Sequence, residues 1–218
     1  MIRLLPFVLA LPLLGSAKAD DASTRFVLVE LYTSQGCDMC PEAEKILGAI
    51  AEDRRVVPIA FHVDYFNDPW RDVFSDPLYS RRQMAYNDAY RGPKPASYGL
   101  YYTPMVMVDG RVSVNGRDPA AIRAAVRAAR SRPPGVSIDV DLEKSEDGAS
   151  GLAKIRVARR SNRIGDEPLL LCAVLREDGV ATDVLSGENR GKTLIARHPA
   201  RATEYEDVAL PKAEPAVR

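Results

Sequence analysis

Cys37 and Cys40 are the residues of this chain best suited to chemistry. Two residues separate them, so their sulfurs can close a small disulfide ring and reopen it. An apolar run at residues 26–32 precedes the pair, and apolar residues at helical spacing follow it, which places the pair where a strand ends and a helix begins. The partial positive charge of a helix N-terminus favours the thiolate that attacks disulfides. The spacing therefore predicts a redox-active pair.

A second feature lies far downstream. Thr103 and Pro104 stand directly before an apolar run at residues 105–108. An X-Pro bond has only a small preference for trans, so a proline in this position is a candidate for a cis peptide bond. The alternative is an edge-strand proline with no role in a site.

The first half of the chain predicts alternating strands and helices around these residues. Apolar runs predict strands at residues 26–32, 56–63, 105–108 and 112–114, and helical spacing predicts helices at residues 41–52, 78–90 and 119–130. Asp109-Gly110 is a strong hairpin signal between two of the strands. This order of elements is that of the minimal thioredoxin fold. In that fold a cis proline packs against the Cys-x-x-Cys motif, so Thr103 and Pro104 are predicted to position substrate.

Residues 132–135 break the last helix and are predicted to be a linker. Short apolar runs beyond it predict strands at residues 136–142, 152–158, 169–175, 180–185, 193–196 and 203–210. They favour a small antiparallel β-sandwich or an extension of the first sheet. The predicted fold class is α/β: a thioredoxin-like domain at residues 20–131, then a smaller, mostly antiparallel β region at residues 136–210 and a loose tail at residues 211–218.

The N-terminus has the pattern of a secretory signal. A basic start at Arg3, an apolar stretch at residues 4–14 and the Ala-Lys-Ala sequence at residues 17–19 predict cleavage before Asp20. The apolar stretch is short for a bilayer and contains two prolines. We therefore expect a periplasmic or secreted protein with no stable membrane span once the signal peptide, residues 1–19, is removed.

The charge balance excludes one class of partner. The full chain has 30 Lys and Arg against 30 Asp and Glu, and the predicted signal contains Arg3 and Lys18 but no acidic residue. The mature chain therefore carries a net charge of about −2. A nucleic-acid backbone requires a basic surface, which this composition does not supply.

Several segments together resemble a known family. They are residues 29–37, with their Thr-Ser-Gln-Gly-Cys ending, Cys40-Pro41, residues 61–65, Thr103-Pro104 and residues 187–194. They resemble the secreted thioredoxin-like proteins catalogued as domain of unknown function 1223, over most of the mature chain. The resemblance implies a thioredoxin-like N-terminal half, a C-terminal β region and export, and it supplies no activity. Acidic residues around the cysteines predict a first-cysteine pKa less depressed than in strong periplasmic oxidants.

His62 and Asp64, at the end of the second predicted strand, are possible accessory residues. His62 would shape the site through hydrogen bonds or carry a proton for Cys40. Cys37, Cys40 and His62 could also bind copper or zinc, but a fourth ligand is not evident, and we predict no metal and no cofactor. The loop at residues 64–70 contains the single tryptophan and either lines a substrate groove or packs into the core.

Cys172 is the cysteine left over from the pair, in an apolar run at residues 168–175. It is interpreted either as a small buried hydrophobe or as a resolving or intermolecular thiol.

These observations favour an exported thiol–disulfide oxidoreductase acting on protein or small thiol substrates, with an electron donor or acceptor that the sequence does not name. Cys37, exposed before the helix, would attack and form a mixed disulfide, and Cys40, facing the interior, would resolve it. The alternative is a non-catalytic secreted binding module with a structural Cys37–Cys40 disulfide, or, less favoured, a Cys/His metal-binding protein. Exposure of Cys37 separates catalysis from a structural disulfide.

Overall fold

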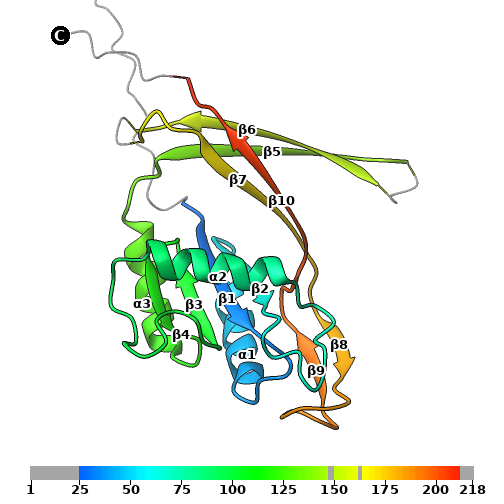
Figure 1. Ribbon diagram of the computed structural model, residues 1–218. Coiled ribbons are helices and arrows are strands. Elements are labelled where there is room, and N and C mark those ends of the chain that lie inside the picture. The colour runs from blue at the N-terminus through cyan, green and yellow to red at the C-terminus, as the bar shows by residue number, and fades with distance from the viewer. Residues whose placement is uncertain (1–24, 147–149, 162–163, 212–218) are drawn as a thin grey trace, which may run out of the picture.

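A computed structural model describes residues 25–146, 150–161 and 164–211 (Figure 1). The predicted signal peptide, and all of the predicted tail beyond residue 211, lie outside the described residues. The elements in chain order are β1 (Val27–Thr33), α1 (Cys40–Ala51), β2 (Val56–His62), α2 (Pro77–Ala89), β3 (Met105–Val108), β4 (Val112–Asn115), α3 (Pro119–Arg130), β5 (Val136–Lys144), β6 (Gly151–Arg159), β7 (Leu169–Arg176), β8 (Val180–Asp183), β9 (Thr193–Ala196) and β10 (Ala200–Val208).

The first half of the chain forms a four-stranded mixed sheet in the order β2-β1-β3-β4. Strands β1 and β2 are parallel and are connected through α1, whereas β3 is antiparallel to β1 and to β4. The predicted order of strands and helices is confirmed here, with ends that differ by one or two residues. The hairpin signal is confirmed as well, because Asp109 and Gly110 both have the positive φ that a two-residue hairpin turn requires.

Both faces of this sheet are covered, which explains why its strands are almost continuously apolar. One face packs against α1 and α3, with a core that includes Leu31, Leu47 and Ile122. The other face packs against α2, with Phe61 and Tyr79 in its core. Strand β1 is thereby held rigidly, and the turn that follows it carries the two cysteines.

Strand β1 also contains a buried charge, Glu30. Its carboxylate pairs with Arg82 of α2 at 2.7 Å and accepts a hydrogen bond from the Tyr86 hydroxyl at 2.6 Å. Arg82 and Tyr86 compensate the free-energy cost of burying the Glu30 carboxylate. These contacts tie α2 to the centre of the sheet.

The C-terminal half forms three separate two-stranded antiparallel sheets, β5-β6, β7-β10 and β8-β9. The β region is antiparallel, as predicted, but both predicted arrangements are wrong, because its described strands form neither a β-sandwich nor an extension of the first sheet. A sandwich requires each sheet to bury one face against the other, whereas Ile138, Val140 and Leu142 on one face of β5 are 55%, 52% and 72% exposed. Figure 1 shows β5 and β6 extending away from the α/β half.

The C-terminal half nevertheless contacts the first sheet. The backbone N–H of Ala60 in β2 donates to the carbonyl of His198 at 2.9 Å, and Ala60 forms an isolated bridge with Pro199. Strands β8 and β9 lie beside α1 in Figure 1. No helix among the described residues is long and apolar enough to cross a membrane.

Candidate functional site

The cysteine pair lies where strand β1 gives way to helix α1. Cys40 is the first residue of the helix, and Cys37 lies in the turn before it. The turn is closed by hydrogen bonds from Cys37 N to the Ser34 carbonyl (3.2 Å) and from Cys40 N to the Cys37 carbonyl (3.3 Å). No side chain caps the helix at Met39. The N–H groups of Met39 and Cys40 lie near enough to the Cys37 sulfur to favour its thiolate. Both cysteines are free thiols.

The expected exposure of Cys37 is wrong, because its residue is only 1% exposed, beside 0% for Cys40. Two distant segments cover the turn. The carbonyl of Phe66 lies 2.9 Å from the position that a Cβ on Gly36 would occupy, and the side chain of Asn189 bonds the Cys37 carbonyl. Local sequence shows the turn but neither of these neighbours. At this exposure, a disulfide substrate can reach Cys37 only after the surrounding atoms move.

The two thiols have opposite pKa shifts. A hydrogen bond from the Cys40 thiol lowers the pKa of Cys37 to about 7, against burial, and the Thr103 hydroxyl and the N–H groups of Met39 and Cys40 act in the same direction. Burial, with the neighbouring Cys37, raises the pKa of Cys40. A value of about 7 lies well above the ~3.5 of the strongest thiol oxidants, as expected from the sequence. Cys37 is the thiol suited to attack.

The Thr103–Pro104 peptide bond is cis, as predicted. The Thr103 hydroxyl is buried and makes no hydrogen bond of ordinary geometry within the described residues, but it lies near enough to lower the pKa of both thiols. Thr103, two residues before β3, therefore lies beside the cysteine pair.

Gly116 leaves the space that Pro104 and Ala43 of α1 occupy beside it. A Cβ on Gly116 would lie 2.9 Å from the Pro104 Cβ and 3.1 Å from the Ala43 Cβ in α1, and neither atom can rotate away. Position 116 therefore requires glycine because of close approach.

We expect Gly116→Ala to lower the free energy of unfolding by about 1–3 kcal/mol through overpacking. Gly48→Ala is the matched control, since its Cβ would meet only ordinary contacts with Arg197 and the helix interior favours alanine by about 0.5–1 kcal/mol. Urea denaturation of both variants measures the two changes. Equal stability of the Gly116 variant and the wild type would mean that Pro104 is not held tightly.

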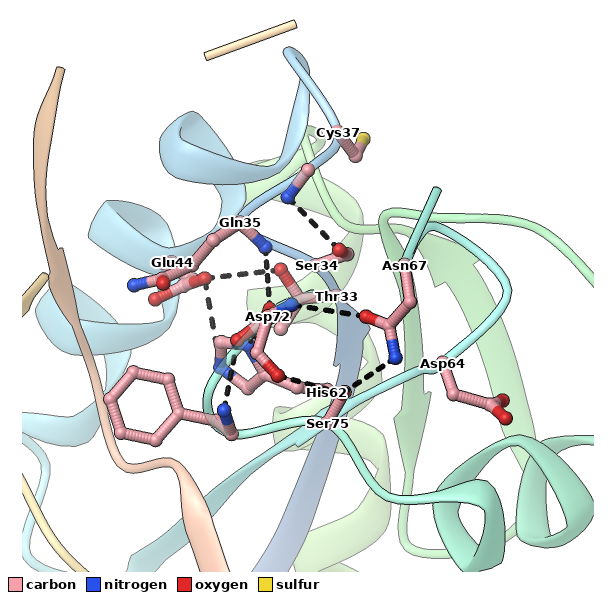
Figure 2. A network of polar contacts seen from close by, with 12 residues as sticks. Thr33, Ser34, Gln35, Cys37, Glu44, His62, Asp64, Asn67, Asp72 and Ser75 are labelled. Carbon is pink, nitrogen blue, oxygen red and sulfur yellow. Dashed lines mark hydrogen bonds and ion pairs between the residues drawn. The ribbon is translucent and has the colours of Figure 1, made fainter. Parts of the chain in front are cut away.

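A buried polar network lies beneath the cysteine turn, as Figure 2 shows. His62 Nδ1 lies 2.7 Å from Asp72 Oδ2, and both side chains are fully buried. The same carboxylate accepts hydrogen bonds from the N–H groups of Gln35 at 2.7 Å and Phe74 at 3.0 Å. Gln35 is two residues from Cys37, so the network fixes the strand end from which the cysteine turn departs.

Burial opposes a charge on His62, but the adjacent Asp72 carboxylate outweighs it and raises the histidine pKa. The pKa of Asp72 is lowered against its own burial by His62 and by the N–H donors. The two form an ion pair.

Glu44 of α1 extends this network toward the C-terminal half. It accepts hydrogen bonds from the Thr33 hydroxyl and from the backbone N–H of Arg197, both at 3.1 Å. His62 Nε2 lies 3.9 Å from its carboxylate and makes no hydrogen bond within the described residues. Burial raises the pKa of Glu44. His62 therefore lies between two carboxylates, of which only Asp72 is in direct contact.

Asp64 does not join His62, although the sequence paired them. Strand β2 ends at His62, and the chain then turns toward α2, so that the Asp64 carboxylate accepts a hydrogen bond from the Ser80 hydroxyl. In Figure 2 its side chain lies apart from the network. Asp72, ten residues downstream of His62, is the partner that sequence reasoning missed.

Asn189 is the second functional residue that sequence reasoning missed. It is fully buried, and its Nδ2 donates to the carbonyls of Gln35 and Cys37, each at 2.8 Å. The residue belongs to the segment 187–194 that was noted only for its family resemblance. Its neighbours in sequence do not indicate a role for Asn189, because the carbonyls that it binds lie about 150 residues earlier in the chain.

Comparison with known proteins places this arrangement in a family. Residues 28–213 match the family described as protein of unknown function (DUF1223). The chain belongs to the DUF1223 family. An X-ray crystal structure of a protein from Agrobacterium tumefaciens is similar, with a TM-score of 0.62 and 24% sequence identity over 82% of this chain and 71% of that chain. This likeness shows a shared fold. No curated protein matches the chain.

Other candidate residues of this DUF1223 protein lie as follows. Burial raises the pKa of Tyr65, in the loop at residues 64–70, and the nearby cysteines add to the shift; its ring lies tilted against that of Tyr101, with 4.4 Å between the ring centroids. Trp70 is half-buried, so it is not a core residue. Cys172 in β7 is half-buried opposite Tyr205 of β10. Among the described residues, no three His, Cys, Asp or Glu side chains are grouped as a metal site.

Proposed function

We propose that this DUF1223 protein is an exported thiol–disulfide oxidoreductase whose N-terminal half is thioredoxin-like. The element order, the sheet order β2-β1-β3-β4 and the antiparallel β3 support that fold. Export rests on the signal pattern of residues 1–19 and would supply the oxidising compartment in which such proteins act.

The proposal rests on the opposite pKa shifts of Cys37 and Cys40. The lowered pKa of Cys37 supplies a nucleophile at neutral pH, while Cys40 is kept as a thiol until it is needed. Cys37 would attack one sulfur of a substrate disulfide and release the other as a thiolate. Cys40, once deprotonated, would attack the Cys37 sulfur of the mixed disulfide, release the second substrate thiol and leave a Cys37–Cys40 disulfide. A thiol donor would then reduce that disulfide; the cysteines carry the electrons, and no cofactor is involved.

Thr103 and Pro104 would position the substrate. The Thr103 hydroxyl lies near both thiols, and an extended protein segment would lie beside the pair at the cis Thr103–Pro104 bond, directly before β3. Tyr65, with its ring tilted against that of Tyr101, would form a neighbouring wall of the same site.

The burial of Cys37 supports a second candidate, the non-catalytic binding module with a structural disulfide. A structural bond needs no access, whereas a catalytic sulfur needs at least transient access. The lowered pKa of Cys37 has no use in a structural disulfide, and for this reason the oxidoreductase is preferred.

Reduction of insulin by dithiothreitol, with the mature protein as catalyst, tests the choice. We expect Cys37→Ser to lower the catalysed rate at least about a hundredfold, because attack is lost altogether. Cys172→Ser is the matched control and should leave the rate unchanged. An inactive wild type with a Cys37–Cys40 disulfide that resists dithiothreitol would instead establish the structural role.

A further inference from the structure

We propose that Asn189, a residue of the C-terminal half, is a positioning residue for the Cys37 thiolate. This inference rests on the proposed function. It gives the C-terminal half a part in the chemistry, because the residue reaches the cysteine turn from the far end of the chain.

The side chain of Asn189 makes three hydrogen bonds, two of them to the cysteine turn. Its amide nitrogen has two hydrogens, and each is donated to a carbonyl of the cysteine turn, those of Gln35 and Cys37, at 2.8 Å. Its Oδ1 accepts from Lys192 Nζ at 2.8 Å. All the polar atoms of the side chain are thus used, and the residue is 0% exposed. A buried amide bonded in this way fixes the peptides that it touches.

The two carbonyls that Asn189 holds lie on either side of the Gly36–Cys37 peptide. With the Cys37 carbonyl fixed, the N–H groups of Met39 and Cys40 remain directed toward the Cys37 sulfur, where both help to lower its pKa. If the Cys37 carbonyl rotated, the Cys40 N–H would lose it as an acceptor, and the turn that directs the two N–H groups toward the sulfur would change. Asn189 therefore acts on the sulfur through the backbone, without touching it.

The segment that carries Asn189 is itself well anchored. Val184 N donates to the Lys192 carbonyl at 3.0 Å and Gly191 N donates to the Val184 carbonyl at 2.8 Å, closing the loop between β8 and β9. The neighbouring Glu188 accepts a hydrogen bond from Asp38 N at 2.8 Å, on the other side of Cys37. The loop thus contacts the backbone on both sides of the attacking cysteine.

Glu188 is expected to act against Asn189 on the thiolate. Its carboxylate places a negative charge beside the residue that follows Cys37, near the N-terminus of α1, where it opposes a second negative charge. Glu188→Gln keeps an oxygen acceptor for Asp38 N but removes the charge. The two neighbouring residues therefore give substitutions with opposite predicted signs.

The test is the pH titration of thiolate absorbance at 240 nm in reduced full-length mature protein, with Cys172→Ser in every variant so that only the pair is followed. We expect Asn189→Ala to shift the Cys37 midpoint upward by about one pH unit, and Glu188→Gln to shift it slightly downward. Arg190→Ala, an exposed position in the same loop, should leave the midpoint unchanged. Thermal unfolding of each variant shows whether it is folded at the temperature of the titration.

An unchanged midpoint in a folded Asn189→Ala variant overturns the inference, as does an equal upward shift in Arg190→Ala. If Asn189→Ala does not fold, Asn189→Ser takes its place, because a serine hydroxyl has one hydrogen and cannot donate to both carbonyls: an upward shift supports the inference, and no shift refutes it. Because thiolate absorbance needs no substrate, the titration is independent of the insulin assay. A shifted midpoint in a protein without reductase activity would leave the positioning role intact and remove only the proposed function.

Discussion

Replacing Cys40 with alanine should trap mixed disulfides between Cys37 and its substrates, whereas replacing Cys37 with alanine should trap few. At pH 7, about half of Cys37 is thiolate and less than about 1% of Cys40 is, because the first pKa is about 7 and the second is raised above its ordinary value of 9.0. Cys40→Ala removes the thiol hydrogen bond that contributes most to the low pKa of Cys37. Attack therefore continues at a lower rate, helped by the Thr103 hydroxyl and the N–H groups of residues 39 and 40, while resolution is lost. The second variant keeps only a buried, protonated thiol.

Non-reducing gels of the two variants, purified from the exported fraction after rapid acid quenching, measure the adducts. We expect more adduct with Cys40→Ala than with Cys37→Ala, because the Thr103 hydroxyl and the backbone N–H groups still favour the Cys37 thiolate, whereas burial still opposes the Cys40 thiolate. The double variant is the control for disulfides through Cys172. Equal adduct in both single variants would refute the assignment of roles, and no adduct in either would favour the structural disulfide.

Replacing Asp72 with alanine should lower the free energy of unfolding by about 3–5 kcal/mol, the range for breaking a buried ion pair. The change leaves His62 buried without its counter-ion and removes the acceptor for the N–H groups of Gln35 and Phe74. Asp64→Ala is the matched control. Its carboxylate contacts the Ser80 hydroxyl on a partly exposed surface, so the expected cost is about 1 kcal/mol.

The pKa shifts of Asp72 and His62 predict that stability falls both in acid and at higher pH. The pKa of Asp72 is lowered from 3.8 in the folded state, so its contribution is present above pH 3.8 and is lost as the pH falls through the folded value. The pKa of His62 is raised from 6.5, so its contribution is present below pH 6.5 and is lost as the pH rises through the folded value. The pKa of Glu44 is raised from 4.5, so stability is also lost as the pH rises above 4.5, which moves the maximum toward the acidic side.

Both contributions are therefore complete only between about pH 4 and pH 6.5. Urea denaturation across that range should give a stability maximum in the wild type and a flatter profile in Asp72→Ala. Identical profiles in the two proteins would mean that the pair is not charged in the folded state.

The local features of the site could be read from the sequence. The Cys-x-x-Cys motif at a strand-to-helix junction, the Asp109-Gly110 hairpin and the cis bond before Pro104 each depend on neighbouring residues, and each occurs where it was predicted. Apolar periodicity also placed the helices and most strands within two residues. Such features follow from backbone preferences and from which side of an element is buried, and both are visible within a short stretch of sequence.

The sequence did not show how the C-terminal strands combine. Each strand was recognisable from its apolar run, but whether two ribbons form a sandwich depends on how their faces meet. In β5 the alternate residues Ile138, Val140 and Leu142 are aligned on one face, as in a sandwich strand, yet more than half of each side chain is exposed. Alternation reports that a strand has an apolar face, not what covers that face.

What the sequence by itself determined is the family, the order of elements and the position of the two cysteines before α1. Only the tertiary structure decided the surroundings of those cysteines: the burial of Cys37, the pairing of His62 with Asp72, and the hydrogen bonds of Asn189 to the cysteine turn. The physical reason is that the choice of a side-chain partner depends on where the chain returns in space. Asn189 comes within 2.8 Å of the Cys37 carbonyl only because β8 and β9 pack beside α1, about 150 residues farther along the chain.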